Sequence, residues 1–339
     1  MIEVEQIRET LSSHGYDYKK YLGEGSFSNV VLCQSQKYKD YFAVKRAVKN
    51  RLTASEYNTL ISLIHPNIIR LYDSFDDKEA QYLVMEYCSN GTLFQKGALP
   101  YEKFVCYAKE ILEALAYCHS LKIAHRDIKP ENIFIDKYDH IKLADFGMSK
   151  QFEYERKTKE KCGSLMYIAP EMLRNDEFCP FKADIWALGI TFFFMATGRH
   201  AFQCTSREEL KKMIFFGDLN FLDFPVDQRI RFLITKMTTL DLKSRPTAEK
   251  LLKLPMFSST STLKSLILTD KSKKHSFSAG YCTPFNLDSV KSGRLDNGFK
   301  SADDDIARQV PMSNIHSYRG INLYPQIQRN NRRFHQTKL

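Results

Sequence analysis

The chain has 339 residues, of which 43% are hydrophobic and 13% aromatic. This composition provides for a sizeable core and excludes a wholly disordered protein, and the length suits two average domains or one large domain with an appendage. The formal net charge is +10, but residues 258–339 contain 13 Lys and Arg against 6 Asp and Glu and so carry seven of those charges. The preceding part is nearly balanced and has no evident polyanion-binding character, so we expect no nucleic-acid binding.

The cysteines and the apolar runs predict a soluble protein of the cytoplasm or nucleus. No C-x-x-C pair occurs, which indicates reduced thiols, not a disulfide framework or a zinc site. The N-terminal "MIEVEQIRET" is acidic and mixed, which argues against a signal peptide. The most apolar run, "IWALGITFFFMATG" (185–198), is too short for a transmembrane segment and is expected to be a buried helix. The eight scattered cysteines are Cys33, Cys88, Cys106, Cys118, Cys162, Cys179, Cys204 and Cys282.

Residues 16–90 are predicted to form short strands around one helix. In "YFAVKRAV" (41–48), Ala43 and Lys45 alternate with Phe42 and Val44, as expected for a strand with two different faces. "AQYLVMEYC" (80–88) reads as a continuous apolar strand, and "SEYNTLISLIH" (55–65) has helical spacing.

From residue 101 the pattern becomes helical. "PYEKFVCYAKEILEALAYCHS" (100–120) has apolar residues at helical spacing behind a proline start signal. A β-rich lobe joined by "CSNGT" (88–92) to a helical lobe predicts an α+β fold with a ligand cleft at the junction.

The two ends of the chain are expected to lie outside this fold. Residues 1–15 form an N-terminal extension. Residues 258–339 are rich in Ser, Asn and Lys without sustained periodicity, which predicts a mostly disordered, basic, low-complexity tail.

A glycine-containing loop and a lysine on the first lobe are candidates for phosphate binding. "LGEGSFSNV" (22–30) has two glycines that would let backbone N–H groups approach phosphate oxygens, although such a pair also marks ordinary hairpin turns. Lys45 lies 22 residues after Gly23, on a strand whose apolar pattern indicates burial. A buried lysine needs an anionic partner, and Glu56 on the following helical stretch could provide one together with a phosphate.

The strongest chemical signal is "HRDIKPENIFI" followed by "IKLADFG". Asp127 and Asn132 lie in the first segment and Asp145 in the second, and apolar strands flank both charged clusters. Carboxylate and amide oxygens suit Mg²⁺, which also bridges phosphates. A second carboxylate near a substrate hydroxyl suits proton acceptance.

Six motifs in order give this chain a resemblance to the eukaryotic protein kinases: "GEGSFSNV", "AVK", "HRDIKPEN", "DFG", "APE" and "DIWALG". The resemblance covers residues 16–257 and implies a two-lobed kinase fold, with an N-lobe at 16–86 and a C-lobe at 94–257. Lys129 in "HRDIKPEN" resembles the serine/threonine class. The "CGS…Y.APE" and "RPTAEKLLKLPMF" segments resemble the calcium/calmodulin-dependent and AMP-activated kinase group.

The resemblance implies an ATP-dependent serine/threonine protein kinase of intracellular signalling, with ATP and Mg²⁺ as cosubstrate and cofactor. Lys45 would hold the α- and β-phosphates and pair with Glu56. Asp127 would accept or orient the substrate hydroxyl proton, Lys129 would lie near the transferred phosphoryl group, and Asn132 and Asp145 would hold Mg²⁺. The nucleotide would further be contacted by Leu22, Gly23, Gly25, Val30, Ala43, Met85, Glu86 and Cys88, the last two through their backbone.

The same resemblance assigns structural roles. An apolar spine between the lobes would contain Leu60, Leu71, His125 and Phe146. Glu171 and Arg245 would form a buried ion pair. Two departures stand out: Ser28 replaces the third glycine of the loop, and Lys45 and Glu56 are 11 residues apart, short of the family spacing by roughly two helical turns. Either the helix bearing Glu56 or the loop before it is shortened.

Substrate and partner expectations follow from single positions. Glu131 would read a basic residue upstream of the acceptor, but Thr92 occupies a position that is often acidic in relatives, so we expect a weaker basic preference. Ser164 would help to select Ser or Thr acceptors, and Leu165 and Met166 suggest an apolar residue after the acceptor. The tail is interpreted as a solvated linker, a docking arm or a calmodulin-binding segment around 262–277, and these alternatives stay open.

Two other functions are considered. A pseudokinase scaffold would bind partners without phosphate transfer, but it has no chemical need for Lys45, Asp127, Asn132 and Asp145 together. A nucleic-acid binder would use the basic tail, yet no recurring aromatic and basic pattern supports it.

The segment 145–171 corresponds to the activation segment of the resembled family. Regulated relatives carry a phosphorylatable threonine two residues before the Cys of "CGS", and the Arg of H-R-D, here Arg126, holds its phosphate. In this chain that position is Glu160, and Thr158 lies two residues earlier. We hypothesise that Glu160 partly substitutes for the phosphate; the alternatives are that it is one more solvated charge, or that Thr158 is the switch.

Overall fold

The computed structural model describes residues 2–25, 28–49, 51–153, 157–174, 177–217 and 219–258. The predicted tail, with its docking and calmodulin-binding interpretations, therefore lies outside the described residues except for Ser258. Within these ranges, no helix is both long and apolar enough to cross a membrane.

The first lobe is built on a five-stranded antiparallel sheet. Its spatial order is β1-β2-β3-β5-β4, so the last two strands exchange places relative to the sequence. In β3 the predicted alternation holds: Val44 is fully buried, and its neighbours Ala43 and Lys45 are partly exposed on the other face. The strands are β1 (Tyr16–Gly25), β2 (Ser28–Ser35), β3 (Tyr41–Val48), β4 (Leu71–Asp76) and β5 (Ala80–Glu86).

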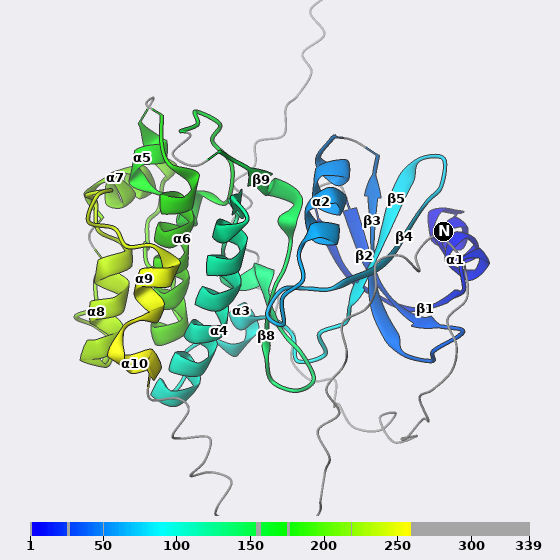
Figure 1. Ribbon diagram of the computed structural model, residues 1–339, viewed down its shortest axis with the longest axis horizontal. Coiled ribbons are helices and arrows are strands. Elements are labelled where there is room, and N and C mark those ends of the chain that lie inside the picture. The colour runs from blue at the N-terminus through cyan, green and yellow to red at the C-terminus, as the bar shows by residue number, and fades with distance from the viewer. Residues whose placement is uncertain are drawn as a thin grey trace, which may run out of the picture. The chain divides into compact units, whose positions relative to one another are not determined.

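An N-terminal helix, α1 (Ile2–Ser13), packs on this sheet beside β1 (Figure 1). Its side chains Ile7 and Leu11 are buried in one cluster with Val31, Cys33 and Val44. The ring of His14, just after the helix, stacks on Phe75 of β4 at a centroid distance of 4.0 Å. The extension at 1–15 thus contains an ordered helix that covers apolar side chains of the sheet.

The helix that carries Glu56 is α2 (Arg51–Ser62). Only residues 49 and 50 separate it from the end of β3, and the helix begins five residues before Glu56. The short Lys45-to-Glu56 spacing therefore reflects a minimal connection together with a helix that starts close to Glu56.

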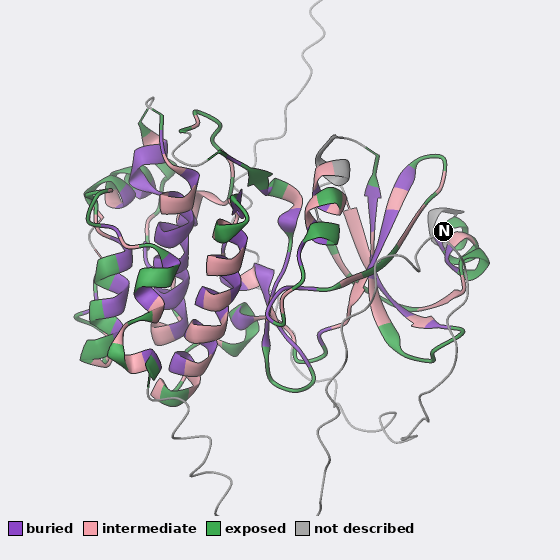
Figure 2. Cartoon of the chain, viewed as in Figure 1, coloured by how far each residue is buried: buried purple, intermediate pink, exposed green. Residues whose placement is uncertain are grey.

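The second lobe is helical around α6 (Pro180–Thr197), which is buried along nearly its whole length (Figure 2). This helix is the apolar run expected to be a buried helix, and Gly198, at φ +67°, ends it in the left-handed conformation. The predicted helix at 100–120 is α4 (Tyr101–Ser120). The other helices are α3 (Leu93–Lys96), α5 (Pro170–Leu173), α7 (Arg207–Phe216), α8 (Gln228–Met237), α9 (Ala248–Leu252) and α10 (Pro255–Ser258).

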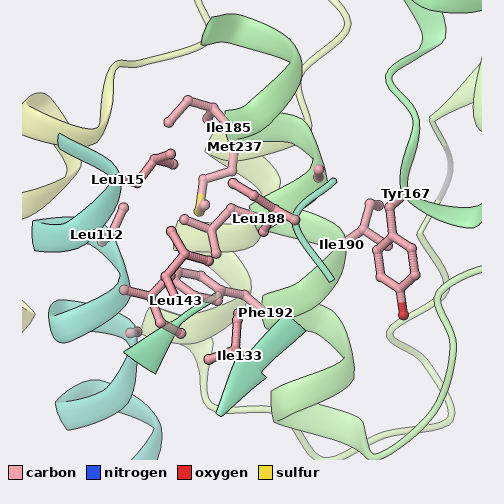
Figure 3. Close-up of a cluster of buried hydrophobic side chains, with 14 of the residues drawn as sticks. Leu112, Leu115, Ile133, Leu143, Tyr167, Ile185, Leu188, Ile190, Phe192 and Met237 are labelled. Carbon is pink, nitrogen blue, oxygen red and sulfur yellow. The ribbon is translucent and has the colours of Figure 1, made fainter. Parts of the chain in front are cut away.

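The core of the second lobe fixes the loops that follow its small sheets. Figure 3 shows Leu112 and Leu115 of α4 meeting Ile185 and Leu188 of α6, with Met237 of α8 beside them. Ile133 and Leu143 lie next to this core in paired strands β7 (Ile133–Ile135) and β8 (Ile141–Leu143). The remaining elements are β6 (Ile123–Ala124), β9 (Lys150–Gln151) and three 3₁₀ turns, η1 (Pro130–Asn132), η2 (Phe146–Met148) and η3 (Leu165–Tyr167). A β-rich lobe followed by a helical lobe confirms the predicted α+β, two-lobed fold.

Candidate active site

Strand register places four predicted nucleotide-site residues on one face of the sheet. Val30 of β2 lies opposite Lys45 of β3, and Ala43 lies opposite Met85 of β5. Opposite residues of antiparallel strands share a face, as do alternate residues of one strand. All four side chains are partly exposed, so this face is accessible to a ligand.

The two glycines of the glycine-containing segment lie at the paired ends of β1 and β2. Gly23 pairs with Val30 at an irregularity in the strand, and Gly25 pairs with Ser28. A Cβ added to Gly23 would meet no atom within 4 Å, so the space beside it is open. Leu22 is 37% exposed. The tip of the loop, positions 26 and 27, lies outside the described residues.

Lys45, Glu56 and Asp145 meet at the inner end of this face. The Nζ of Lys45 lies 2.7 and 2.9 Å from the two carboxylate oxygens of Glu56 and 3.0 Å from Oδ1 of Asp145. Burial alone would lower the pKa of Lys45, but Glu56 and Asp145 outweigh it and raise the pKa above its usual value. Conversely, burial would raise the pKa of Asp145, but Lys45 holds it below its usual value. Burial raises the pKa of Glu56, and the charge of Lys45 offsets this only in part. The structure thus brings the lysine and both carboxylates together.

A second polar cluster surrounds the carboxylate of Asp127. The Nζ of Lys129 donates to Oδ2 at 2.6 Å, and Nδ2 of Asn132 donates to the same oxygen at 3.1 Å. The backbone N–H and the hydroxyl of Ser164 both donate to Oδ1 at 3.0 Å. Lys129 also donates to the Ser164 hydroxyl at 2.9 Å. Two residues of the loop 125–132 and one of the activation segment therefore fix the orientation of one carboxylate.

The donor set of Asn132 and Asp145 fits a magnesium ion bound together with a nucleotide. The N–H of Ala144 donates to the carbonyl of Asn132 at 2.9 Å, which ties the residue before Asp145 to Asn132. The Asp145 side chain is 44% exposed, so its carboxylate has room for another ligand. Among the described residues no three His, Cys, Asp or Glu side chains gather as a metal site. Phosphate oxygens and water would complete the coordination, as Mg²⁺ prefers.

A buried carboxylate that the sequence reasoning did not single out holds the catalytic loop. Asp184 of α6 is 2% exposed and accepts the backbone N–H of His125 and of Arg126, each at 2.8 Å. Arg126 and Asp145 have left-handed backbones at φ +70° and +61°, which are strained for residues other than glycine. The lone Asp in the apolar run "DIWALGITFFFMA" was the signal for such an anchor.

The segment that links the lobes has its own ion pair. The side chain of Glu86 contacts Nζ of Lys142 in β8 at 2.9 Å, and its backbone N–H donates to the carbonyl of Arg70 at 2.9 Å. That N–H is therefore not available to a nucleotide. Burial raises the pKa of the nearby Cys88 thiol to about 12, so the thiol is neutral.

Three of the four predicted spine residues are buried, and the fourth, Leu71, is partly buried. His125 and Phe146 are fully buried and pack edge to face with a centroid distance of 4.8 Å. Leu60 of α2 is 2% exposed in the same cluster, and Leu71 packs against it. The Nε2 of His125 lies 3.0 Å from the carbonyl of Ala144, which links the spine to the residue before Asp145.

The predicted buried ion pair of the second lobe is present between Glu171 and Arg245. Their closest atoms are 2.6 Å apart, and the side chains are 9% and 0% exposed. Arg245 also donates to the carbonyls of Thr239 and Lys182. The pair fixes the end of the activation segment to the loop before α9.

The activation segment packs closely on the catalytic loop. Gly163 has φ +95°, and a Cβ there would come within 2.6 Å of the carbonyl of Arg126. Only glycine fits this position without movement of the backbone. Thr158 exchanges two backbone hydrogen bonds of 3.0 Å with Phe178. Glu160 contacts Arg126 and also Lys150 of β9, and no pattern in the sequence singled out Lys150.

Comparison with known proteins agrees with this geometry. The family model described as "Protein kinase domain" matches residues 16–257. The chain is 36% identical to calcium-dependent protein kinase 6 of Plasmodium berghei over 72% of this chain and 18% of that protein. It is 35% identical to the SNF-related serine/threonine-protein kinase of Rattus norvegicus over 70% of this chain and 33% of that protein. This chain thus spans less than half the length of these two relatives.

A relative of similar size is aurora kinase B of Danio rerio, which is 32% identical over 70% of this chain and 77% of that protein. The expected resemblance to serine/threonine kinases of the calcium/calmodulin-dependent and AMP-activated kinase group is confirmed by the first two relatives. The matched family model covers more than half of the chain, from the first strand to the last helices. The chain therefore belongs to the protein kinase domain family.

Proposed function

We propose that this chain is an active ATP-dependent serine/threonine protein kinase of intracellular signalling. The observation that carries the proposal is the pairing of Lys45 with both Glu56 and Asp145, beside an Asp127 carboxylate held by Lys129 and Ser164. A scaffold that only binds partners has no need for both arrangements. The reduced thiols of the seven described cysteines support a location in the cytoplasm or nucleus.

The proposed reaction moves the γ-phosphoryl group of ATP to a hydroxyl of a protein substrate. A bond forms between the substrate oxygen and the γ-phosphorus, the bond from that phosphorus to the β,γ-bridging oxygen breaks, and ADP leaves with its electron pair. The hydroxyl proton passes to the carboxylate of Asp127, whose orientation Ser164 and Asn132 fix.

Charge near the phosphates is supplied by named side chains. Lys45, held in place by Glu56, would contact the α- and β-phosphates, and Lys129 would lie beside the group in transfer. Asn132 and Asp145 would hold Mg²⁺, which neutralises phosphate charge when bound. Lys129, two residues after Asp127, supports the serine/threonine class.

The experiment that tests this function uses the purified full chain with Mg-ATP labelled at the γ-phosphate and a degenerate peptide library. We expect label on Ser and Thr peptides, no label with Asp145→Ala, and none after chelation of Mg²⁺. The exposed carboxylate Asp223 provides a matched control, because Asp223→Ala removes a charge far from the site chemistry. Wild type that binds Mg-ATP without transferring label would favour the pseudokinase alternative.

The same library tests the proposed substrate preference. Glu131 is partly exposed, which supports recognition of one upstream donor group. Thr92, which occupies the position that is often acidic in relatives, provides no negative charge for a basic substrate residue. We therefore expect upstream Arg to raise the rate only modestly, and a near-absolute requirement for Arg would contradict this.

A further inference from the structure

The carboxylate of Glu160 lies between two cations that come from different parts of the second lobe. Lys150 of β9 places its Nζ 2.8 and 3.0 Å from the two carboxylate oxygens. Arg126 places Nη2 3.3 Å from Oε2 and 3.4 Å from the backbone carbonyl of the same residue. The Glu160 side chain is 55% exposed, yet both of its carboxylate oxygens contact a cation.

The two cations would repel each other without an anion between them. Both also lie over the ring of Phe152, Arg126 at 5.7 Å and Lys150 at 5.9 Å from its centroid. The Arg126 side chain is only 11% exposed, so water screens it poorly. The hydrogen bond from Lys150, then the charges of Lys150 and Arg126, hold the pKa of Glu160 below its usual value. Glu160 is therefore ionised at neutral pH.

The cations connect Glu160 to the catalytic loop. Arg126 directly precedes Asp127, and its backbone N–H is fixed on Asp184. Lys150 pairs with Ala124 in the small sheet of β6 and β9, at the entry to the same loop. An anion held by both side chains is therefore held at a fixed distance from Asp127.

Only three residues separate Glu160 from Ser164, whose N–H and hydroxyl both contact Asp127. Between them, Gly163 lies against the carbonyl of Arg126. On the other side, the Thr158 hydroxyl accepts the N–H of Glu160 at 3.0 Å. The stretch that contains Glu160 is therefore tied to the catalytic carboxylate through Ser164.

We propose that Glu160 is a positioning residue that holds the activation segment in its working conformation through Arg126 and Lys150, without phosphorylation of the segment. The inference rests on the proposed kinase activity. A carboxylate has about half the charge of a phosphate, so the segment is held less firmly than a phosphate would hold it. The role of Lys150 is as important as that of Arg126, because its two contacts are the shorter ones.

The test measures kcat and KM of the full chain after phosphatase treatment, with the unphosphorylated state checked by intact mass. The variants are Glu160→Gln, Glu160→Asp, Lys150→Gln and the double variant Glu160→Gln/Lys150→Gln. Glu177→Gln is the matched control, since Glu177 lines the same surface hollow but pairs with neither cation in the described part of the chain. Melting temperatures establish that each variant is folded.

We expect unphosphorylated wild type to be active and Glu160→Gln to lower kcat at least about threefold, as for two partly exposed ion pairs. KM for ATP stays unchanged, because the nucleotide site is not touched. Glu160→Asp recovers part of the lost kcat. The kcat of the double variant is no lower than that of the less active single variant, because both substitutions remove the same contact. The difference in kcat between Glu160→Gln and wild type becomes smaller as the NaCl concentration approaches about 1 M, where the Debye length is about 3 Å.

Three results would overturn the proposal. One is a kcat of Glu160→Gln equal to that of the Glu177→Gln control. Another is additive losses in the double variant, which would show that the two residues act separately. The third is unphosphorylated wild type that is inactive and gains activity on phosphorylation of Thr158. If wild type transfers no phosphate in any state, the proposed function itself fails, and this is distinguishable from a failure of Glu160 alone.

Discussion

At the scale of single residues, the chemistry was readable from the sequence and the anchoring of the chemical groups was not. The order and spacing of the motifs identify the four residues expected to do the chemistry, which are Lys45, Asp127, Asn132 and Asp145. Asp184 contacts Arg126 at 2.8 Å across 58 residues, and the sequence gives only a lone Asp in an apolar run as a signal for it. Lys150 contacts Glu160 at 2.8 Å, and no pattern in the sequence indicates that pair.

The ion pair of Glu171 and Arg245 gives a prediction at this scale. Glu171→Ala leaves a guanidinium that is 0% exposed without its carboxylate, so we expect it to lower the free energy of unfolding by about 3–5 kcal/mol. Denaturant unfolding monitored by tryptophan fluorescence measures this. Glu113→Ala is the control: its partner Lys109 is 3.9 Å away on an exposed helix face, and we expect a loss under about 1 kcal/mol. Equal losses in the two variants would contradict the account.

At the scale of elements, long periodic segments were predictable and the short N-terminal helix was not. The stripe of α4 and the apolar run of α6 have patterns that only a packed helix satisfies. α1 has a weak apolar pattern over twelve residues, and its burial depends on a sheet surface formed by residues far along the chain. The sequence likewise did not decide whether the loop before α2 or the helix itself is short, because the ends of β3 and α2 depend on the folded structure.

α1 is predicted to be part of the folded N-lobe and not a dispensable extension. Leu11 is fully buried, so Leu11→Ala should lower the free energy of unfolding by about 2–5 kcal/mol. The exposed Gln6 on the same helix provides the control, and Gln6→Ala should change it by less than about 0.5 kcal/mol. Urea unfolding curves report both values. A Leu11→Ala variant as stable as Gln6→Ala would mean that α1 does not pack on the sheet in solution.

At the scale of the molecule, the described part of the chain combines a sheet face open to a ligand with a helical lobe that fixes a carboxylate. Lys45 and its partner Glu56 belong to the first lobe, and the second acid that Lys45 contacts, Asp145, belongs to the second lobe. The order of motifs predicted this arrangement, because each motif lies in or beside an element whose place in the fold is set by the elements around it. The preferred substrate depends on surfaces whose side chains the motifs do not specify.

The most direct measurement of the central claim is the initial rate of phosphate transfer from Mg-ATP to a Ser peptide by wild type and by Asp127→Asn, with ATP affinity measured in parallel. Asp127→Asn keeps the shape of the site but removes the proton acceptor. We expect unchanged ATP affinity and a rate lower by about 100-fold or more. Equal rates for the two proteins, or wild type that binds ATP and transfers nothing, would contradict the assignment of this chain as an active kinase.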